Sequence, residues 1–254
     1  MEFGLNLYSV RDLIKTEDGY LNTIKSLKEM GISYVQYSGA DFIPERIEKV
    51  SNITNIPTIL THVSMDRIIN DTFQLMKEHD MFGCKNIGLG AMPQNIIKDK
   101  NELFKTIQAL DKAGKVMKDT GFKFFYHNHH FEFYKYDGKT ILDYIIENTE
   151  NINITLDTYW VQYGGGDIID YVRKLKDRIE CVHLKDYMIT KTEDNKLEPK
   201  FAPLGDGNLN FKRIIDEMKK SNVKYFLIEQ DNAVDFENPL EQIERSTKYL
   251  KSNF

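Results

Sequence analysis

The chain has 254 residues, of which 41% are hydrophobic and 29% are charged, as in an ordinary globular protein with a sizeable core. This length fits two ordinary domains or one large α/β barrel. The formal net charge of −5 argues against a nucleic-acid partner, and no apolar run approaches membrane-spanning length. Because no basic-then-apolar leader is present, we expect a cytoplasmic protein without a membrane partner. The two cysteines, Cys84 and Cys181, lie in apolar patterns and are expected to be free core thiols.

Predicted strands and helices alternate along the chain. Apolar or alternating patterns predict eight strands, at residues 3–10, 33–38, 57–64, 84–89, from 123 onward, 152–157, 179–186 and 225–229. Helical spacing predicts helices near residues 18–30, 43–52, 66–82, 99–119, 140–148, 168–176, 210–221 and 239–250. The polar, proline- and glycine-containing stretch 188–209 is predicted to be the longest loop, and residues 134–138 a turn.

Eight strand-then-helix units in about 250 residues predict a single (β/α)₈ TIM-barrel domain over residues 1–254. An open doubly wound sheet is the alternative. Such a sheet usually carries a glycine-rich phosphate-binding turn after its first strand. The corresponding segment, residues 8–12, has no glycine, so the pattern favours the barrel.

Polar side chains stand at the carboxyl ends of five predicted strands, where TIM barrels place their active sites: His62, His127, Asp157, His183 and Glu229. Neighbouring strands lie about 4.8 Å apart, so inward-facing side chains at these ends can converge on one ion. Imidazoles and carboxylates without a thiolate suit Mn²⁺, Mg²⁺, Co²⁺ or Fe²⁺, with Zn²⁺ also open. Each residue could instead cap a loop by itself, and a hydrogen-bonded structural role suits His62 equally well.

Three of the six histidines fall within residues 127–130, directly after an aromatic run. Strand geometry places His127 and His129 on one face, with Tyr126 and Asn128 on the other. Glu132 follows closely. This stretch predicts one end of a metal site, although a polar surface loop would have the same composition.

The ordered motifs Leu7–Asp12, Tyr126–His129, Leu156–Thr158, His183–Asp186, Pro203–Gly207 and Ile228–Asp231 extend over the whole chain. With them the sequence resembles the xylose-isomerase-like TIM-barrel superfamily, which includes inosose dehydratases, ketose epimerases and class II AP endonucleases. The resemblance implies metal ligands at Asp157, His183 and Glu229. At the first ligand position, normally a glutamate, this chain has His127, and Asn128, His129 or Glu132 could replace it.

A nuclease is not implied, because Trp160 occupies the position of a zinc-binding histidine in the endonucleases. The resemblance implies instead a metal-dependent isomerase or epimerase that converts a small ketose, or a related polyol ketone, through an enediolate. Glu229 or Glu132 would take the proton. Two alternatives stay open: a lyase that dehydrates an inosose or cleaves a keto-glycoside, and a non-catalytic sugar-binding barrel.

The remaining candidate residues have auxiliary roles in this hypothesis. Lys185 would steady an oxyanion, and His129 is a candidate acid or base. The expected substrate-binding residues are Tyr8, His62, Asn128 and Trp160. The partner would be a sugar or sugar-derived ketone, and a homo-oligomer stays open.

Overall fold

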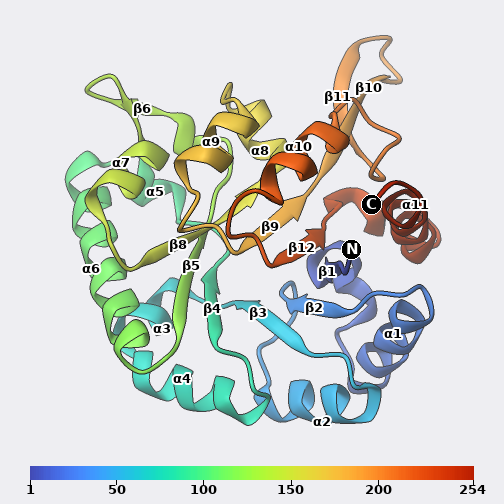
Figure 1. Cartoon of the computed structure of the whole chain (residues 1–254), viewed down its shortest axis with the longest axis horizontal. Coiled ribbons are helices and arrows are strands. Elements are labelled where there is room, and N and C mark those ends of the chain that lie inside the picture. Colours follow the sequence, from blue (N-terminus) through green and yellow to red (C-terminus); the bar gives the residue numbers. More distant parts are fainter.

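The computed structural model describes residues 1–254 and contains a closed barrel of parallel strands (Figure 1). In sequence order the barrel strands are β1 (Gly4–Asn6), β2 (Tyr34–Tyr37), β3 (Thr58–His62), β4 (Asn86–Leu89), β5 (Lys123–His127), β8 (Ile152–Asp157), β9 (Cys181–Leu184) and β12 (Tyr225–Ile228). Each strand pairs with its neighbours in this order, and β12 closes the ring against β1. The predicted eight-stranded α/β barrel is therefore confirmed.

Helices surround the strands (Figure 1). The α-helices are α1 (Glu17–Glu29), α2 (Pro44–Thr54), α3 (Met65–Asn70), α4 (Thr72–Met81), α5 (Gln94–Ile97), α6 (Lys100–Asp119), α7 (Ile141–Asn148), α8 (Thr158–Tyr163), α9 (Ile168–Lys174), α10 (Phe211–Met218) and α11 (Pro239–Asn253). Three 3₁₀ helices are η1 (Leu7–Leu13), η2 (Phe131–Phe133) and η3 (Asp231–Asp235). None of these helices is both long and apolar enough to cross a lipid bilayer.

Two hydrophobic clusters occupy the interior, and the smaller one prepares the site. The larger cluster, of 53 buried residues, holds the helices against the sheet. The smaller joins Leu60, Phe125 and Cys181, one residue from each of β3, β5 and β9. Because side chains alternate along a strand, the residues two positions further point the same way. These residues are His62, His127 and His183, so a layer of imidazoles lies next to the smaller cluster, on its side toward the carboxyl ends of the strands.

Two predicted boundaries are wrong at the start of the barrel. Strand β1 ends at Asn6, where the side chain accepts a hydrogen bond from the Tyr8 amide and caps helix η1. The predicted strand over residues 3–10 is shortened for that reason. The predicted helix over residues 66–82 is interrupted at Asp71, whose backbone is not helical (φ −132°, ψ 31°), and so becomes α3 and α4.

The stretch 188–209 is not a loop throughout, contrary to the prediction. Strand β10 (Asp186–Lys191) pairs antiparallel with β11 (Leu197–Ala202), and this hairpin extends outward beyond the helices (Figure 1). Asn195 in the connecting turn has a left-handed backbone (φ 67°), which asparagine tolerates. The predicted turn at 134–138 also lies in a small hairpin, formed by β6 (Lys135–Tyr136) and β7 (Lys139–Thr140).

Candidate metal centre and cavity

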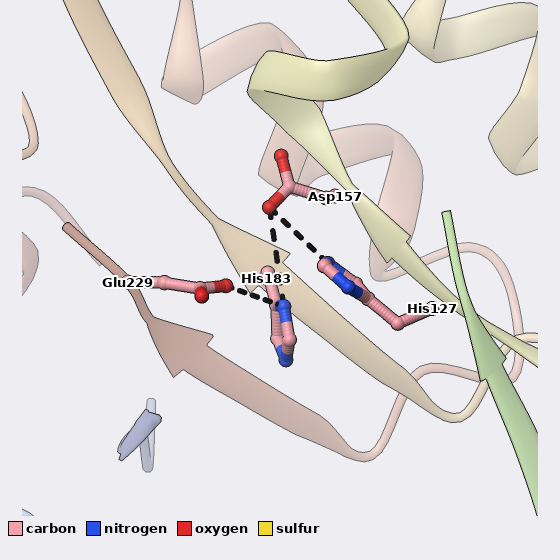
Figure 2. A group of neighbouring side chains, drawn as sticks. All are labelled: His127, Asp157, His183 and Glu229. Atoms are coloured by element: carbon pink, nitrogen blue, oxygen red, sulfur yellow. Dashed lines mark hydrogen bonds and ion pairs between the residues drawn. The ribbon is translucent and has the colours of Figure 1, made fainter. Parts of the chain in front are cut away.

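Four buried side chains converge at the carboxyl ends of β5, β8, β9 and β12: His127, Asp157, His183 and Glu229 (Figure 2). Each offers one ligand atom, and these atoms all lie within 4.8 Å of one another. Asp157 Oδ2 is 3.5 Å from His127 Nε2 and 3.9 Å from His183 Nδ1. His183 Nδ1 is 2.5 Å from Glu229 Oε2. The barrel therefore brings together the four residues predicted to hold the ion.

Both imidazoles are oriented by acceptors on their far sides. His127 Nδ1 lies 2.9 Å from the carbonyl oxygen of Gly90, and His183 Nε2 lies 2.8 Å from Gln36 Oε1. A carbonyl oxygen only accepts hydrogen bonds, so each of these two nitrogens carries the proton. The lone pairs of His127 Nε2 and His183 Nδ1 then point toward the carboxylates, as in metal-binding histidines.

This arrangement fits a bound cation. His183 Nδ1 and Glu229 Oε2 are buried and have no hydrogen-bond partner, although they face each other closely. A lone pair beside a carboxylate oxygen is repulsive, and unpaired buried polar atoms are costly, so this pair needs a shared proton or a positive ion that both atoms coordinate. Without an ion, burial favours the neutral acid, but the positive charges of a protonated His183 and of Lys185 outweigh it and hold the pKa of Glu229 well below its usual range. The centre is thus built to keep this carboxylate ionised.

A cavity of about 320 Å³ opens beside the cluster. It is lined by residues from several strand ends and loops: Asn6, Tyr8, Ser38, Gly39, His62, Gly90, Ala91, His127, His129, Lys185, Glu229 and Asp231. Added side-chain bulk at Gly90 would meet the His62 ring 2.9 Å away, so glycine leaves room for that imidazole. The predicted residues Tyr8, His62, His129, Lys185 and Glu229 therefore border one shared space.

Lys185 is the most deeply buried cation of the site, with its side chain 1% exposed. Its ammonium lies 2.8 Å from Asp231 Oδ1, 3.6 Å from Asp157 Oδ2 and 3.7 Å from Glu229 Oε1. It is also 5.0 Å from the ring centroid of Trp160. Burial disfavours the charged form, but the three carboxylates outweigh it and raise the pKa of Lys185 above its usual range. Lys185 is therefore a fixed positive charge beside the four-residue cluster.

Two predicted residues lie behind the cavity. Asn128 is fully buried, and its Oδ1 accepts a hydrogen bond from the Asp157 amide at 3.0 Å. Glu132 is also fully buried and accepts hydrogen bonds from the Tyr126 hydroxyl (2.5 Å) and the His129 amide (2.8 Å). Burial raises the pKa of Glu132 to about 7. Helix η2 turns Glu132 back toward the outer face of β5, so neither side chain borders the cavity as a substrate contact or a base would.

Trp160 stands beside the cavity but does not line it. Its amide is 2.9 Å from Asp157 Oδ1, which caps helix α8. Its ring packs against His129 and His130, with centroids 5.4 and 5.1 Å away. Trp160, predicted to bind substrate, therefore packs against His129, which lines the cavity, and does not border the cavity itself.

Sequence reasoning missed two side chains that contact this group. Gln36 is an inward residue of β2 that orients His183, and a lone glutamine in an apolar strand carries no signal of such a role. Asp231 lines the cavity and pairs with Lys185. Its position two residues after Glu229 was the available signal, because the chain leaves the strand at the same rim.

Comparison with known proteins defines the class of this fold and site. The model of the family described as xylose isomerase-like TIM barrel matches residues 64–253. The match covers most of the chain, which therefore belongs to this family, and the expected resemblance is confirmed.

Individual relatives share only a low sequence identity with this chain. Inosose dehydratase of Clostridium perfringens is 27% identical over 174 residues, 59% of this chain and 54% of that protein, so the match spans about half of the relative's length. A sugar phosphate isomerase/epimerase from Parabacteroides distasonis superposes with a TM-score of 0.80 at 18% identity, covering 99% of this chain and 93% of the other. A xylose isomerase-like TIM barrel protein from Mycobacterium smegmatis, in complex with magnesium, gives 0.70 at 12% identity, covering 99% and 95%. At these identities the structures show the shared fold.

Proposed function

We propose that the protein is a divalent-metal-dependent enzyme that removes a proton beside the carbonyl group of a small polyhydroxylated ketone. The observation that carries this proposal is the four-residue cluster with unpaired ligand atoms at the edge of a polar cavity of about 320 Å³. A cavity of this size suits a ligand as small as a monosaccharide. The inosose dehydratase relatives and the isomerase/epimerase neighbour support a sugar-derived ketone as the substrate.

His127, Asp157, His183 and Glu229 would hold the ion. Two imidazoles and two carboxylates without a thiolate favour Mn²⁺, with Mg²⁺, Co²⁺, Fe²⁺ or Zn²⁺ as alternatives. When bound, such an ion supplies Lewis acidity, which stabilises negative charge on a substrate oxygen.

Side chains of the cavity would position the ketone and exclude water. The Lys185 ammonium would donate to the carbonyl oxygen as negative charge develops there. Burial lowers the pKa of His129 to about 2, so its imidazole is neutral at physiological pH and suited to binding hydroxyl groups. Tyr8 and His62 would border the same ligand. Isomerisation or epimerisation follows if the proton returns to carbon.

Dehydration is the second candidate. The same enediolate loses water if a hydroxyl group stands on the carbon next to the one that loses its proton. The relatives matched in sequence favour dehydration, because those from Clostridium perfringens and Mesomycoplasma hyopneumoniae are inosose dehydratases.

One experiment tests both outcomes. Protein purified without chelator is analysed for metal, loaded with Mn²⁺, and incubated in deuterated water with inosose, a ketohexose and a 3-keto-glucoside. Proton NMR is expected to show deuterium entering one of these compounds, or an enone forming from it, and chelation should abolish the change. If none of the compounds exchanges, enolisation is refuted; ligand binding under those conditions would instead support a non-catalytic sugar-binding barrel.

A further inference from the structure

The proposed reaction needs a group that takes the carbon-bound proton, and the two carboxylates first considered are poorly placed. Glu229 Oε2 faces His183 Nδ1 at 2.5 Å and belongs to the metal cluster. Glu132 is fully buried and hydrogen-bonded behind the cavity. The first ligand position holds His127, whose Nδ1 donates to Gly90 and whose Nε2 faces Asp157. None of these groups is free to act on a substrate beside the ion.

Asp231 is the one carboxylate that lines the cavity without belonging to the metal cluster. It is the first residue of helix η3, directly beyond β12, and its side chain is 24% exposed. Its own carbonyl oxygen accepts a hydrogen bond from Arg11 Nη1 at 3.0 Å, which ties the start of η3 to helix η1. The backbone that carries this carboxylate is therefore anchored.

Lys185 links Asp231 to the metal centre. Its ammonium is 2.8 Å from Asp231 Oδ1 and within 3.7 Å of both Asp157 and Glu229. Asp231 is thus one side chain away from the cluster, and it lines the same cavity as Lys185 and Glu229. An ammonium this close to an aspartate orients that carboxylate.

We propose that Asp231 is the catalytic carboxylate that removes the proton, with Lys185 as its positioning partner; this inference rests on the proposed function. The C–H bond beside the carbonyl breaks, and its proton passes to an Asp231 oxygen. The electron pair becomes the C=C bond of the enediolate, and negative charge collects on the former carbonyl oxygen. Return of the proton to the neighbouring carbon, with the hydroxyl proton passing to the former carbonyl oxygen, gives the isomer. Protonation of the opposite face of the same carbon by a second group gives the epimer. Transfer of the abstracted proton to a departing hydroxyl group gives water and the enone.

The test compares wild type with Asp231→Asn, which keeps the size of the side chain but cannot accept the proton. Asp235→Asn is the matched control, because Asp235 lies exposed on the same 3₁₀ helix. His129→Gln tests the rival base, since His129 also lines the cavity. All four proteins are loaded with Mn²⁺, and deuterium exchange is followed by NMR on the same three ketones. Mn²⁺ affinity, measured by electron paramagnetic resonance, gives a readout independent of activity.

We expect Asp231→Asn to slow exchange by at least about 100-fold, the lower end for a general base, with Mn²⁺ affinity and the KM for the ketone nearly unchanged. Asp235→Asn should match wild type. A smaller loss in Asp231→Asn, or a large loss in His129→Gln alone, overturns the assignment. A loss of Mn²⁺ from Asp231→Asn also overturns it, because the residue would then support the metal. If wild type exchanges none of the ketones, the proposed function fails and this inference fails with it.

Discussion

Glu132 gives the sharpest test of the electrostatics behind the cavity. Its carboxyl group is fully buried, and burial raises its pKa from 4.5 to about 7. Glu132→Gln preserves the shape and can keep both contacts, because the amide oxygen can accept from the His129 amide while the amide nitrogen donates to the Tyr126 hydroxyl. The substitution therefore removes the ionisable group and leaves the hydrogen bonds in place.

The sign and size of the effect follow from the shift. Below pH 4.5 the carboxyl group is protonated in both the folded and unfolded states, so it carries no penalty. Between pH 4.5 and 7 the unfolded chain releases the proton while the folded protein retains it, and the free energy of unfolding falls. At 1.36 kcal/mol per pKa unit, this shift removes about 3 kcal/mol by pH 8. Glu132→Gln should lack that loss.

Thermal unfolding of the metal-free proteins, followed by circular dichroism at pH 5 and pH 8, measures the difference. For a chain of this size, about 3 kcal/mol corresponds to roughly 6–12 °C in Tm. The Tm of Glu132→Gln relative to wild type should therefore rise by that amount from pH 5 to pH 8. Glu193→Gln, at an exposed carboxyl group in the β10–β11 turn, should follow wild type at both pH values. Parallel pH profiles for wild type and Glu132→Gln would refute the buried neutral acid.

Three further predictions concern the metal centre and the thiols. Gln36→Met removes the acceptor that orients His183 and should weaken Mn²⁺ binding about 10–100-fold in a calorimetric titration. The far-ultraviolet circular dichroism spectrum should stay the same as that of wild type. Unchanged affinity would show that His183 is held by other contacts. Glu229→Gln should lower the metal content of the purified protein, measured by mass spectrometry, with little change in Tm of the metal-free form; full metal occupancy would remove Glu229 from the ligand set. Cys84 and Cys181 are free and buried, and burial raises the pKa of Cys84 to about 12. Both should react with a thiol reagent only in denaturant, and rapid labelling of the native protein would contradict their core positions.

The barrel itself could be predicted because its signals are local. Each strand is an apolar run bounded by turn residues, and eight repeats of strand and helix leave few topologies. The β10–β11 hairpin escaped prediction because its strands are exposed and contain Lys191, Glu198 and Pro199, so neither shows an apolar face of its own. Tyr187 and Phe201, which pair at its base, both pack against Tyr159 and so connect the hairpin to the aromatic residues near the site.

The metal cluster was predictable for the same reason as the barrel. Asp157, His183 and Glu229 end successive strands, and parallel strands meet at one rim. How deeply each side chain near this rim is buried could not be predicted from the sequence. Glu132 follows the same strand as His127, but the chain turns into η2 there and carries its carboxyl group away from the cavity. That turn depends on the hydrogen bonds that Glu132 accepts, and no local sequence pattern predicts them.

The charges around the cavity bear on the kind of ketone that the proposed reaction would use. With both imidazoles neutral, the two carboxylates of the cluster would balance a divalent ion, and Lys185 balances Asp231. Lys185 is also the one lysine or arginine that lines the cavity, so no cationic side chain is left to pair with a further anion there. A phosphate group inside the cavity would bring about two more negative charges without a partner, and an unpaired buried charge is costly. A neutral polyol ketone brings hydroxyl groups instead, which the neutral side chains of Asn6, Ser38 and His62 can bind, so the charge balance favours an unphosphorylated substrate.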